Sequence, residues 1–231
     1  MTPRTLIVLI LLGAGTTGAS AVETGWHTMA LTGTYARRYV PPGLDQSQPA
    51  PVTLWFHGYG GTPEAYEPHL QGPADAAGLV VVALRDTGPM GWDNSDVAPI
   101  NEALAALGAA MSIDEARVSL SGHSAGGAFS YLIGITDTDR TASRIFAIAA
   151  PYYRIDSAPN DPRVRLCYGT LDPNHASSYG PLTANLDALG IVHVDDIVTG
   201  AGHNDLPPAA LDAAFRFLAE ASGGTTTGGT T

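Results

Sequence analysis

Short, almost continuously apolar segments alternate along the chain with longer segments of helical pattern. The apolar segments cover residues 51–57, 79–84, 117–121, 144–149, 164–168 and 192–198. Strands that are apolar at consecutive positions are buried on both faces, which is typical of a parallel sheet covered by helices. The helical patterns cover residues 64–77, 97–111, 124–135, 178–189 and 207–221. This alternation predicts an α/β fold of three layers, with a mostly parallel central sheet.

One further strand precedes this series. Residues 34–40 (TYARRYV) alternate between apolar and polar, and the proline-proline-glycine sequence 41–43 ends the pattern. The last predicted helix begins at Pro207-Pro208, and Asp205 is a candidate for its N-cap.

The two ends of the chain differ from the part between them. Arg4 precedes an apolar run over residues 6–12, which is too short to span a bilayer, and Ala19-Ser20-Ala21 fits a signal-peptidase site. Residues 1–21 therefore resemble a signal peptide, and we expect a secreted or periplasmic protein with cleavage near Ala21. Residues 222–231 (SGGTTTGGTT) are rich in Gly and Thr, a composition that predicts a flexible tail. One folded domain is expected over residues 22–221.

Composition narrows the possible partners and cofactors. The chain has 231 residues, 45% of them hydrophobic, and a net charge of −11, which disfavours nucleic acid and anionic membranes as partners. Beyond the apolar run over residues 6–12, no segment is apolar enough over sufficient length to predict a membrane helix. No integral membrane association is therefore expected. The single cysteine, Cys167, lies in a predicted strand and excludes an intramolecular disulfide or a cysteine zinc site. Neither metal-ligand spacing nor a nucleotide-binding glycine pattern occurs, so we expect no metal and no cofactor.

A G-x-S-x-G motif stands between a predicted strand and a predicted helix. Residues 122–126 read GHSAG and follow the strand 117–121. In this context the turn is tight and strained, glycine relieves crowding across it, and the serine hydroxyl is lifted above the sheet. The motif predicts Ser124 as a nucleophile.

A second glycine-rich loop follows the strand 51–57. Residues 57–61 read HGYGG. A nucleophilic serine that attacks a carbonyl needs two N–H donors for the oxyanion. We expect these donors to be the backbone N–H groups of Ala125 and Tyr59, with the Tyr59 ring as a candidate wall of the substrate site. His57 is expected to brace the loop by hydrogen bonds.

A serine nucleophile also needs a base and a carboxylate that orients it, and in folds of this kind they follow in the order serine, acid, histidine. Asp172 follows the strand 164–168 in the sequence GTLDP, and His203 follows the strand 192–198 in the sequence GAGHND. Both lie at the strand ends where Ser124 is expected. We predict Asp172 as the acid and His203 as the base.

Other candidates remain at this point. His175 is an alternative base, and Asp195 or Asp196 is an alternative acid. His123 adjoins Ser124, where it either packs inside the protein or lines the substrate site.

These residues resemble the α/β-hydrolase group that contains polyhydroxybutyrate depolymerases and feruloyl or acetylxylan esterases. The matching segments are 38–43 (RYVPPG), 57–61 (HGYGG), 96–97 (DV), 116–127 (ARVSLSGHSAGG), 169–172 (GTLD) and 202–203 (GH). The resemblance implies the α/β-hydrolase fold and a triad of Ser124, Asp172 and His203. It also implies a place for Trp92 near the substrate, with a position in the core or in a lid as the alternative. The short chain leaves little or no room for a cap, which favours an open cleft suited to a bulky or polymeric ester.

The sequence thus predicts a secreted serine esterase that acts on a small or polymeric ester, with polyester or plant-polysaccharide-linked esters favoured. One alternative is a serine peptidase of the same fold. Another is a non-catalytic binding module on a hydrolase scaffold, although such a module would not need a triad and an oxyanion loop. Oligomeric state is left open.

Overall fold

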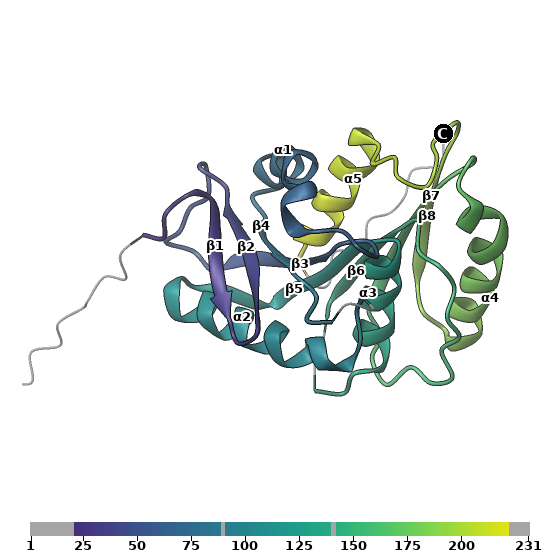
Figure 1. Cartoon of the computed structure of the whole chain (residues 1–231), viewed down its shortest axis with the longest axis horizontal. Coiled ribbons are helices and arrows are strands. Elements are labelled where there is room, and N and C mark those ends of the chain that lie inside the picture. Colours follow the sequence, from purple (N-terminus) through teal and green to yellow (C-terminus); the bar gives the residue numbers. More distant parts are fainter. Residues whose placement is uncertain (1–20, 89–90, 140–141, 222–231) are drawn as a thin grey trace, which may run out of the picture.

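Within the residues that the computed structural model describes (21–88, 91–139 and 142–221), eight strands form one sheet (Figure 1). The spatial order is β1-β2-β4-β3-β5-β6-β7-β8. β1 pairs antiparallel with β2, and β2 pairs antiparallel with β4. From β4 to β8 every pair is parallel. The strands are β1 (Gly25–Leu31), β2 (Thr34–Val40), β3 (Ala50–Phe56), β4 (Val80–Leu84), β5 (Ile113–His123), β6 (Arg144–Ile148), β7 (Arg163–Gly169) and β8 (His193–Val198).

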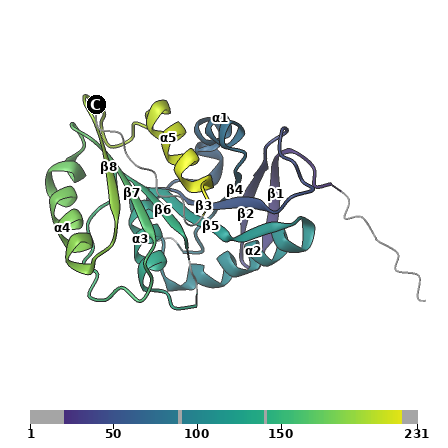
Figure 2. The ribbon, with the colours of Figure 1, turned by 180° about the vertical axis from the view of Figure 1, so that it is seen from behind.

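Helices cover both faces of the sheet, as the ribbon shows from front and back (Figures 1 and 2). One face is covered by α1 (Glu67–Ala77) and α5 (Pro208–Ala219). The other is covered by α2 (Val97–Ala110), α3 (Ala125–Thr136) and α4 (Gly180–Leu189). The central strands β3, β4 and β6 are buried along their whole length, because helices remove both of their faces from water. The predicted three-layer, mostly parallel α/β architecture is confirmed.

Strand β1 is absent from the sequence-based prediction. Its residues GWHTMAL are mostly half-exposed, and only Leu31 is buried. The strand is instead stabilised by pairing with β2, where Trp26 faces Tyr39 with ring centroids 4.9 Å apart. Such cross-strand pairs are invisible to a pattern read along one segment.

Two predicted helix starts also differ from the structure. The segment expected to begin at residue 64 opens with a short 3-10 turn (Pro63–Ala65), and α1 follows from Glu67. The predicted N-cap Asp205 is wrong: α5 is preceded by Pro207, and the Asp205 carboxylate instead accepts the backbone N–H of Gly202 at 2.7 Å. Asp205 therefore shapes the loop that carries His203.

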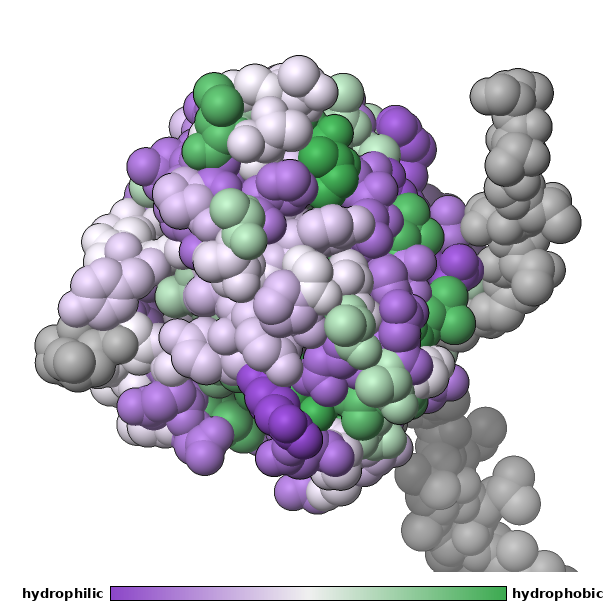
Figure 3. Space-filling view, turned by 90° about the vertical axis from the view of Figure 1, so that its right-hand side faces the viewer, coloured by the Kyte–Doolittle hydropathy of each residue, from purple (hydrophilic) through white to green (hydrophobic). Residues whose placement is uncertain are grey.

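The side of the molecule formed by α4 and β8 is shown in Figure 3, where hydrophobic side chains lie in separate groups within a more hydrophilic surface. Val194 and Ile197 of the edge strand β8 are each 41% exposed. Among the described residues, no helix is both long and apolar enough to cross a membrane.

Candidate active site

Ser124 stands at a sharp turn between β5 and α3. Its backbone has φ 54° and ψ −120°, a conformation that residues with a side chain rarely adopt. The turn requires glycine on both sides: a Cβ at Gly122 would lie 2.5 Å from the Gly126 backbone, and one at Gly126 would lie 2.1 Å from the Phe56 carbonyl oxygen. These contacts leave no room for a methyl group and press the turn against the end of β3.

Ser124, His203 and Asp172 form a continuous hydrogen-bonded chain. The Ser124 hydroxyl donates to His203 Nε2 at 2.9 Å, and His203 Nδ1 donates to Asp172 Oδ1 at 2.9 Å. The Asp172 carboxylate is fully buried, whereas the imidazole is about one third exposed, with a side-chain accessibility of 32%. The same Oδ1 accepts the backbone N–H of Asn174 at 2.9 Å. Three loops at the carboxyl ends of β5, β7 and β8 thus bring the three predicted residues together.

The loops of the acid and the base lie in close contact. A Cβ at Gly169, the last residue of β7, would lie 2.1 Å from the Ala201 carbonyl oxygen. Leu171 also donates its backbone N–H to the Ala201 carbonyl oxygen at 2.9 Å. Glycine at position 169 therefore allows the approach that sets the His203–Asp172 distance.

The alternative acids and base have partners elsewhere. The Asp195 carboxylate accepts from the Tyr179 hydroxyl at 2.9 Å, and Asp196 accepts two hydrogen bonds from Arg165. The His175 ring stacks on the Tyr179 ring, with centroids 5.5 Å apart. Among the described residues, the His203 ring donates a hydrogen bond to Asp172 and accepts one from Ser124.

The predicted oxyanion loop, residues 57–61, lies against this chain. Gly61 donates its N–H to the Gly58 carbonyl oxygen at 2.9 Å, and Gly60 has a positive φ of 69°, so the loop turns sharply at Tyr59. Ala125 is the first residue of α3, where a backbone N–H has no partner within the helix. Tyr59 and Ala125 both line the same cavity as Ser124.

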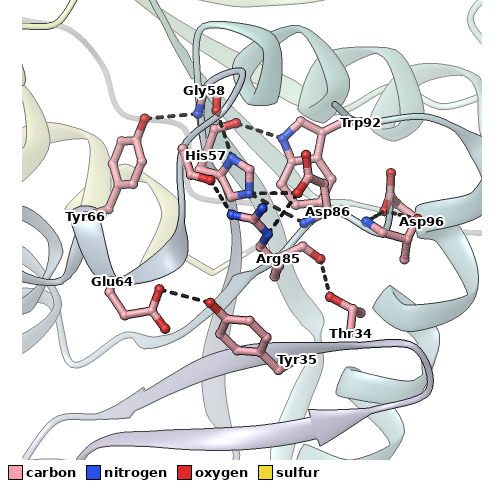
Figure 4. A network of polar contacts seen from close by, with 12 residues as sticks. Thr34, Tyr35, His57, Gly58, Glu64, Tyr66, Arg85, Asp86, Trp92 and Asp96 are labelled. Atoms are coloured by element: carbon pink, nitrogen blue, oxygen red, sulfur yellow. Dashed lines mark hydrogen bonds and ion pairs between the residues drawn. The ribbon is translucent and has the colours of Figure 1, made fainter. Parts of the chain in front are cut away.

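A buried polar network braces the oxyanion loop (Figure 4). His57 Nδ1 donates to the Gly58 carbonyl oxygen at 2.8 Å, and His57 Nε2 lies 3.6 Å from the Asp86 carboxylate. Arg85 donates to the Gly61 carbonyl oxygen at 2.6 Å and lies 3.2 Å from Asp86. Burial lowers the pKa of His57 and so favours its neutral ring. The bracing contacts expected of His57 are present.

Trp92 contacts both the loop and the cavity. Its indole N–H donates to the His57 carbonyl oxygen at 2.7 Å (Figure 4). Its ring stacks on Phe129 with centroids 5.5 Å apart. The ring therefore lines the cavity while the nitrogen holds the loop.

The cavity above Ser124 has a volume of about 700 Å³. Two tyrosines in its lining are strongly exposed, Tyr59 at 66% and Tyr153 at 55%. The lining is mostly apolar and comprises Tyr59, Gly91, Trp92, Ser124, Ala125, Ala128, Phe129, Leu132, Pro151, Tyr153, Pro173, Asn174 and His203.

His123 is buried, with 5% of its surface exposed, at the edge of a second cavity of about 370 Å³. Its Nδ1 lies 2.9 Å from the Tyr66 hydroxyl, and its Nε2 lies 2.8 Å from the His203 carbonyl oxygen. Both ring nitrogens have partners inside the protein, so neither is left for a substrate. Sequence reasoning did not identify Tyr66, because no motif includes it and only folding brings it to Ser124.

The sequence matches no protein-family model and no curated protein. Among solved structures, the chain is similar to an S-formylglutathione hydrolase from Agrobacterium tumefaciens, with 17% identity, a TM-score of 0.67, and coverage of 88% of this chain and 98% of that chain. It is also similar to the thermostable carboxylesterase EstE1 from a metagenomic library, with 17% identity, a TM-score of 0.67, and coverage of 87% and 91%. Esterase PE8 is 22% identical with a TM-score of 0.59, over 85% and 98%. At these identities the likeness concerns the architecture: the chain has the α/β-hydrolase fold.

Proposed function

We propose that this protein is a serine hydrolase that cleaves carboxylic esters through an acyl-enzyme intermediate. The observation that carries the proposal is the hydrogen-bonded chain from Ser124 through His203 to the buried Asp172, with the serine held at a strained turn. A packing turn would need the glycines but not the histidine and the carboxylate.

The proposed reaction proceeds in two halves. Ser124 Oγ attacks the ester carbonyl carbon while His203 Nε2 takes the hydroxyl proton, and the N–H groups of Tyr59 and Ala125 stabilise the oxyanion. The carbon–oxygen bond to the alcohol breaks, and His203 returns the proton to the leaving oxygen. Water then attacks the acyl-enzyme with the same proton transfers, which releases the acid and restores Ser124. Asp172 keeps the imidazole in the required tautomer throughout.

The substrate proposal follows from the cavity. Its aromatic and aliphatic lining suits an apolar or aromatic part of an ester, and the exposed Tyr59 and Tyr153 rings favour a substrate that extends beyond the cavity. We propose polyester or plant-polysaccharide-linked esters as the class. Export of the protein, with cleavage of residues 1–21, belongs to the same proposal. Residues 1–20 and the tail 222–231 lie outside the described residues.

The first experiment is hydrolysis of p-nitrophenyl acetate, butyrate and octanoate by the wild type and by Ser124→Ala. Loss of a serine nucleophile is expected to lower kcat by about 10⁴-fold or more. Ser130→Ala is the matched control, because the hydroxyl of this buried serine on α3 donates to the Gly127 carbonyl oxygen at 2.7 Å. A fluorophosphonate probe should label the wild type and Ser130→Ala, and mass spectrometry should place the adduct on Ser124.

Equal activity in the wild type and Ser124→Ala would contradict the proposed mechanism. Cleavage of peptides but not of esters would favour the peptidase alternative. Absence of both activities and of labelling would favour the binding module.

A further inference from the structure

One tyrosine hydroxyl and one histidine ring connect the three loops around Ser124. Tyr66, just before α1, accepts the backbone N–H of Gly58 at 3.0 Å, as Figure 4 shows. The same hydroxyl lies 2.9 Å from Nδ1 of His123, the residue before the nucleophile. His123 Nε2 lies 2.8 Å from the backbone carbonyl oxygen of His203. The contacts thus run from the oxyanion loop, through the nucleophile turn, to the loop of the base.

Chemistry fixes the direction of every hydrogen bond in this chain. The Gly58 N–H only donates, and the His203 carbonyl only accepts, so His123 Nε2 must carry a proton. A neutral imidazole has one N–H, which leaves Nδ1 as an acceptor for the Tyr66 O–H. Burial lowers the pKa of His123 and so favours this neutral form. The Tyr66 hydroxyl therefore accepts from Gly58 and donates to His123.

The approach of these groups depends on glycine at position 58. A Cβ there would lie 2.9 Å from His123 Nδ1, 3.3 Å from the Tyr66 hydroxyl and 3.4 Å from the Ser124 Cβ. The Gly58 backbone does not have a positive φ, so close packing explains the glycine. Tyr66 and His123 are themselves only 9% and 5% exposed, so water competes little for their hydrogen bonds.

We propose that Tyr66 and His123 are positioning residues. They hold the oxyanion loop and the backbone of His203 at fixed positions relative to Ser124. Neither side chain contacts the reacting atoms in this assignment. The catalytic consequence rests on the proposed esterase function, since an oxyanion donor displaced by even 1 Å costs about 10²-fold in rate. The hydrogen-bond direction itself does not rest on that function.

The first test is Tyr66→Phe, which removes the shared hydroxyl and keeps the ring that packs against Trp55. With rates normalised to titrated active sites, we expect kcat to fall about 10- to 100-fold while KM stays within about twofold. Tyr39→Phe is the matched control, because its hydroxyl bonds to Asp75 in the same face of the core but away from the site. An equal kcat in Tyr66→Phe and Tyr39→Phe would overturn the proposal.

A second test asks whether the Tyr66 and His123 side chains act together as one hydrogen-bonded connection. His123→Gln retains a donor toward the His203 carbonyl and removes the acceptor for Tyr66, whereas His123→Asn does the reverse. If the residues act as one unit, Tyr66→Phe combined with His123→Gln should be no slower than the poorer single variant. Fold losses that multiply in the double variant would show separate roles and count against the proposal.

The third test does not depend on activity. In protein labelled with ¹⁵N-histidine, NMR should show His123 with its proton on Nε2, and Tyr66→Phe should shift the Nδ1 resonance. A proton on Nδ1 would reverse the chain and overturn the proposal. If the NMR result holds but the wild type hydrolyses no ester, the proposed function fails while the hydrogen-bonded connection stands.

Discussion

Two non-glycine residues have a positive φ among those that the structure describes, and each directly follows the carboxyl end of a parallel strand. Ser124 (φ 54°) follows β5, and Ala149 (φ 55°) follows the neighbouring strand β6. The Ala149 carbonyl oxygen accepts from the Asn174 side chain at 2.8 Å, and the Asn174 backbone N–H donates to Asp172. Strained backbone at these two positions is kept because surrounding contacts fix it, which is common at functional sites.

At the level of single residues, Asp172→Asn should show whether Asp172, and not Asp195 or Asp196, is the acid that orients His203. The amide keeps the volume of the carboxylate but not its charge, so His203 loses the partner that orients it and stabilises its protonated form. We expect kcat to fall about 10³- to 10⁴-fold with the fold intact. The same ester assay on Asp195→Asn and Asp196→Asn should give rates within about threefold of the wild type, because their contacts lie elsewhere. A large loss in either control, with little in Asp172→Asn, would reassign the acid.

Gly126→Ala should test the sterics of the nucleophile turn. The added Cβ would meet the Phe56 carbonyl oxygen at 2.1 Å, and backbone atoms cannot move aside cheaply. We expect a loss of unfolding free energy of about 3 kcal/mol, measured by urea denaturation. Gly43→Ala, where a Cβ would have no neighbour within 4 Å, should change stability by less than about 0.5 kcal/mol. Equal stability of both variants would show that the turn relaxes.

At the level of elements, β8 combines two tasks, since it forms the sheet edge and leads into the loop of His203. His193, its first residue, lies 2.9 Å from Asp195 on the same strand and 3.2 Å from Asp187 on α4. These contacts attach α4 to the edge of the sheet. Burial alone would lower the pKa of His193, but hydrogen bonds and charge from the two carboxylates outweigh it and raise the pKa.

This raised pKa predicts how the edge responds to pH. A histidine whose folded pKa exceeds its unfolded value near 6.5 stabilises the fold fully below that value, and the contribution disappears as pH rises through the folded pKa. His193→Gln should therefore lower Tm more at pH 5.5 than at pH 9, by thermal unfolding in low salt. A Tm difference that is independent of pH, or larger at pH 9, would contradict the assigned charge.

At the level of the whole molecule, two neutral histidines lie beneath the site and behave in the opposite way. Burial lowers the pKa values of His57 and His123 from the ordinary value of 6.5. Below pH 6.5 the unfolded chain therefore binds protons at these rings that the native state does not, and the native state loses stability as pH falls.

The corresponding prediction concerns the difference in unfolding free energy between the wild type and His57→Asn. The variant should be less stable at pH 7.5, because it loses the network that holds the oxyanion loop. The gap in unfolding free energy, measured by urea denaturation, should narrow as pH falls from 7.5 to 5.5. A gap that widens on acidification would mean that His57 is protonated in the native state.

Local patterns in the sequence predicted the architecture, which the structure confirms, and the three candidate triad residues, which the structure brings together. Continuous apolar runs are the signature of strands buried on both faces, and G-x-S-x-G between a strand and a helix has a steric meaning that needs no tertiary information. The order of Ser124, Asp172 and His203, each in a loop after a predicted strand, placed them at one edge of the sheet. Strand β1 was not predicted, because it is stabilised by pairing with β2 and its residues show no clear apolar pattern.

The side chains that support the candidate triad could be identified from the folded structure but not from the sequence. The sequence left His175, Asp195 and Asp196 open, and their separate partners became visible once α4 and β8 were packed. Tyr66 lies 58 positions before Ser124 and belongs to no motif, yet its hydroxyl contacts the loop and the turn around that serine. Hydrogen bonds between distant segments depend on ångström-scale approach, which local sequence pattern does not encode. The candidate nucleophile Ser124 can therefore be predicted from a local motif, whereas the contacts that position it form only on folding.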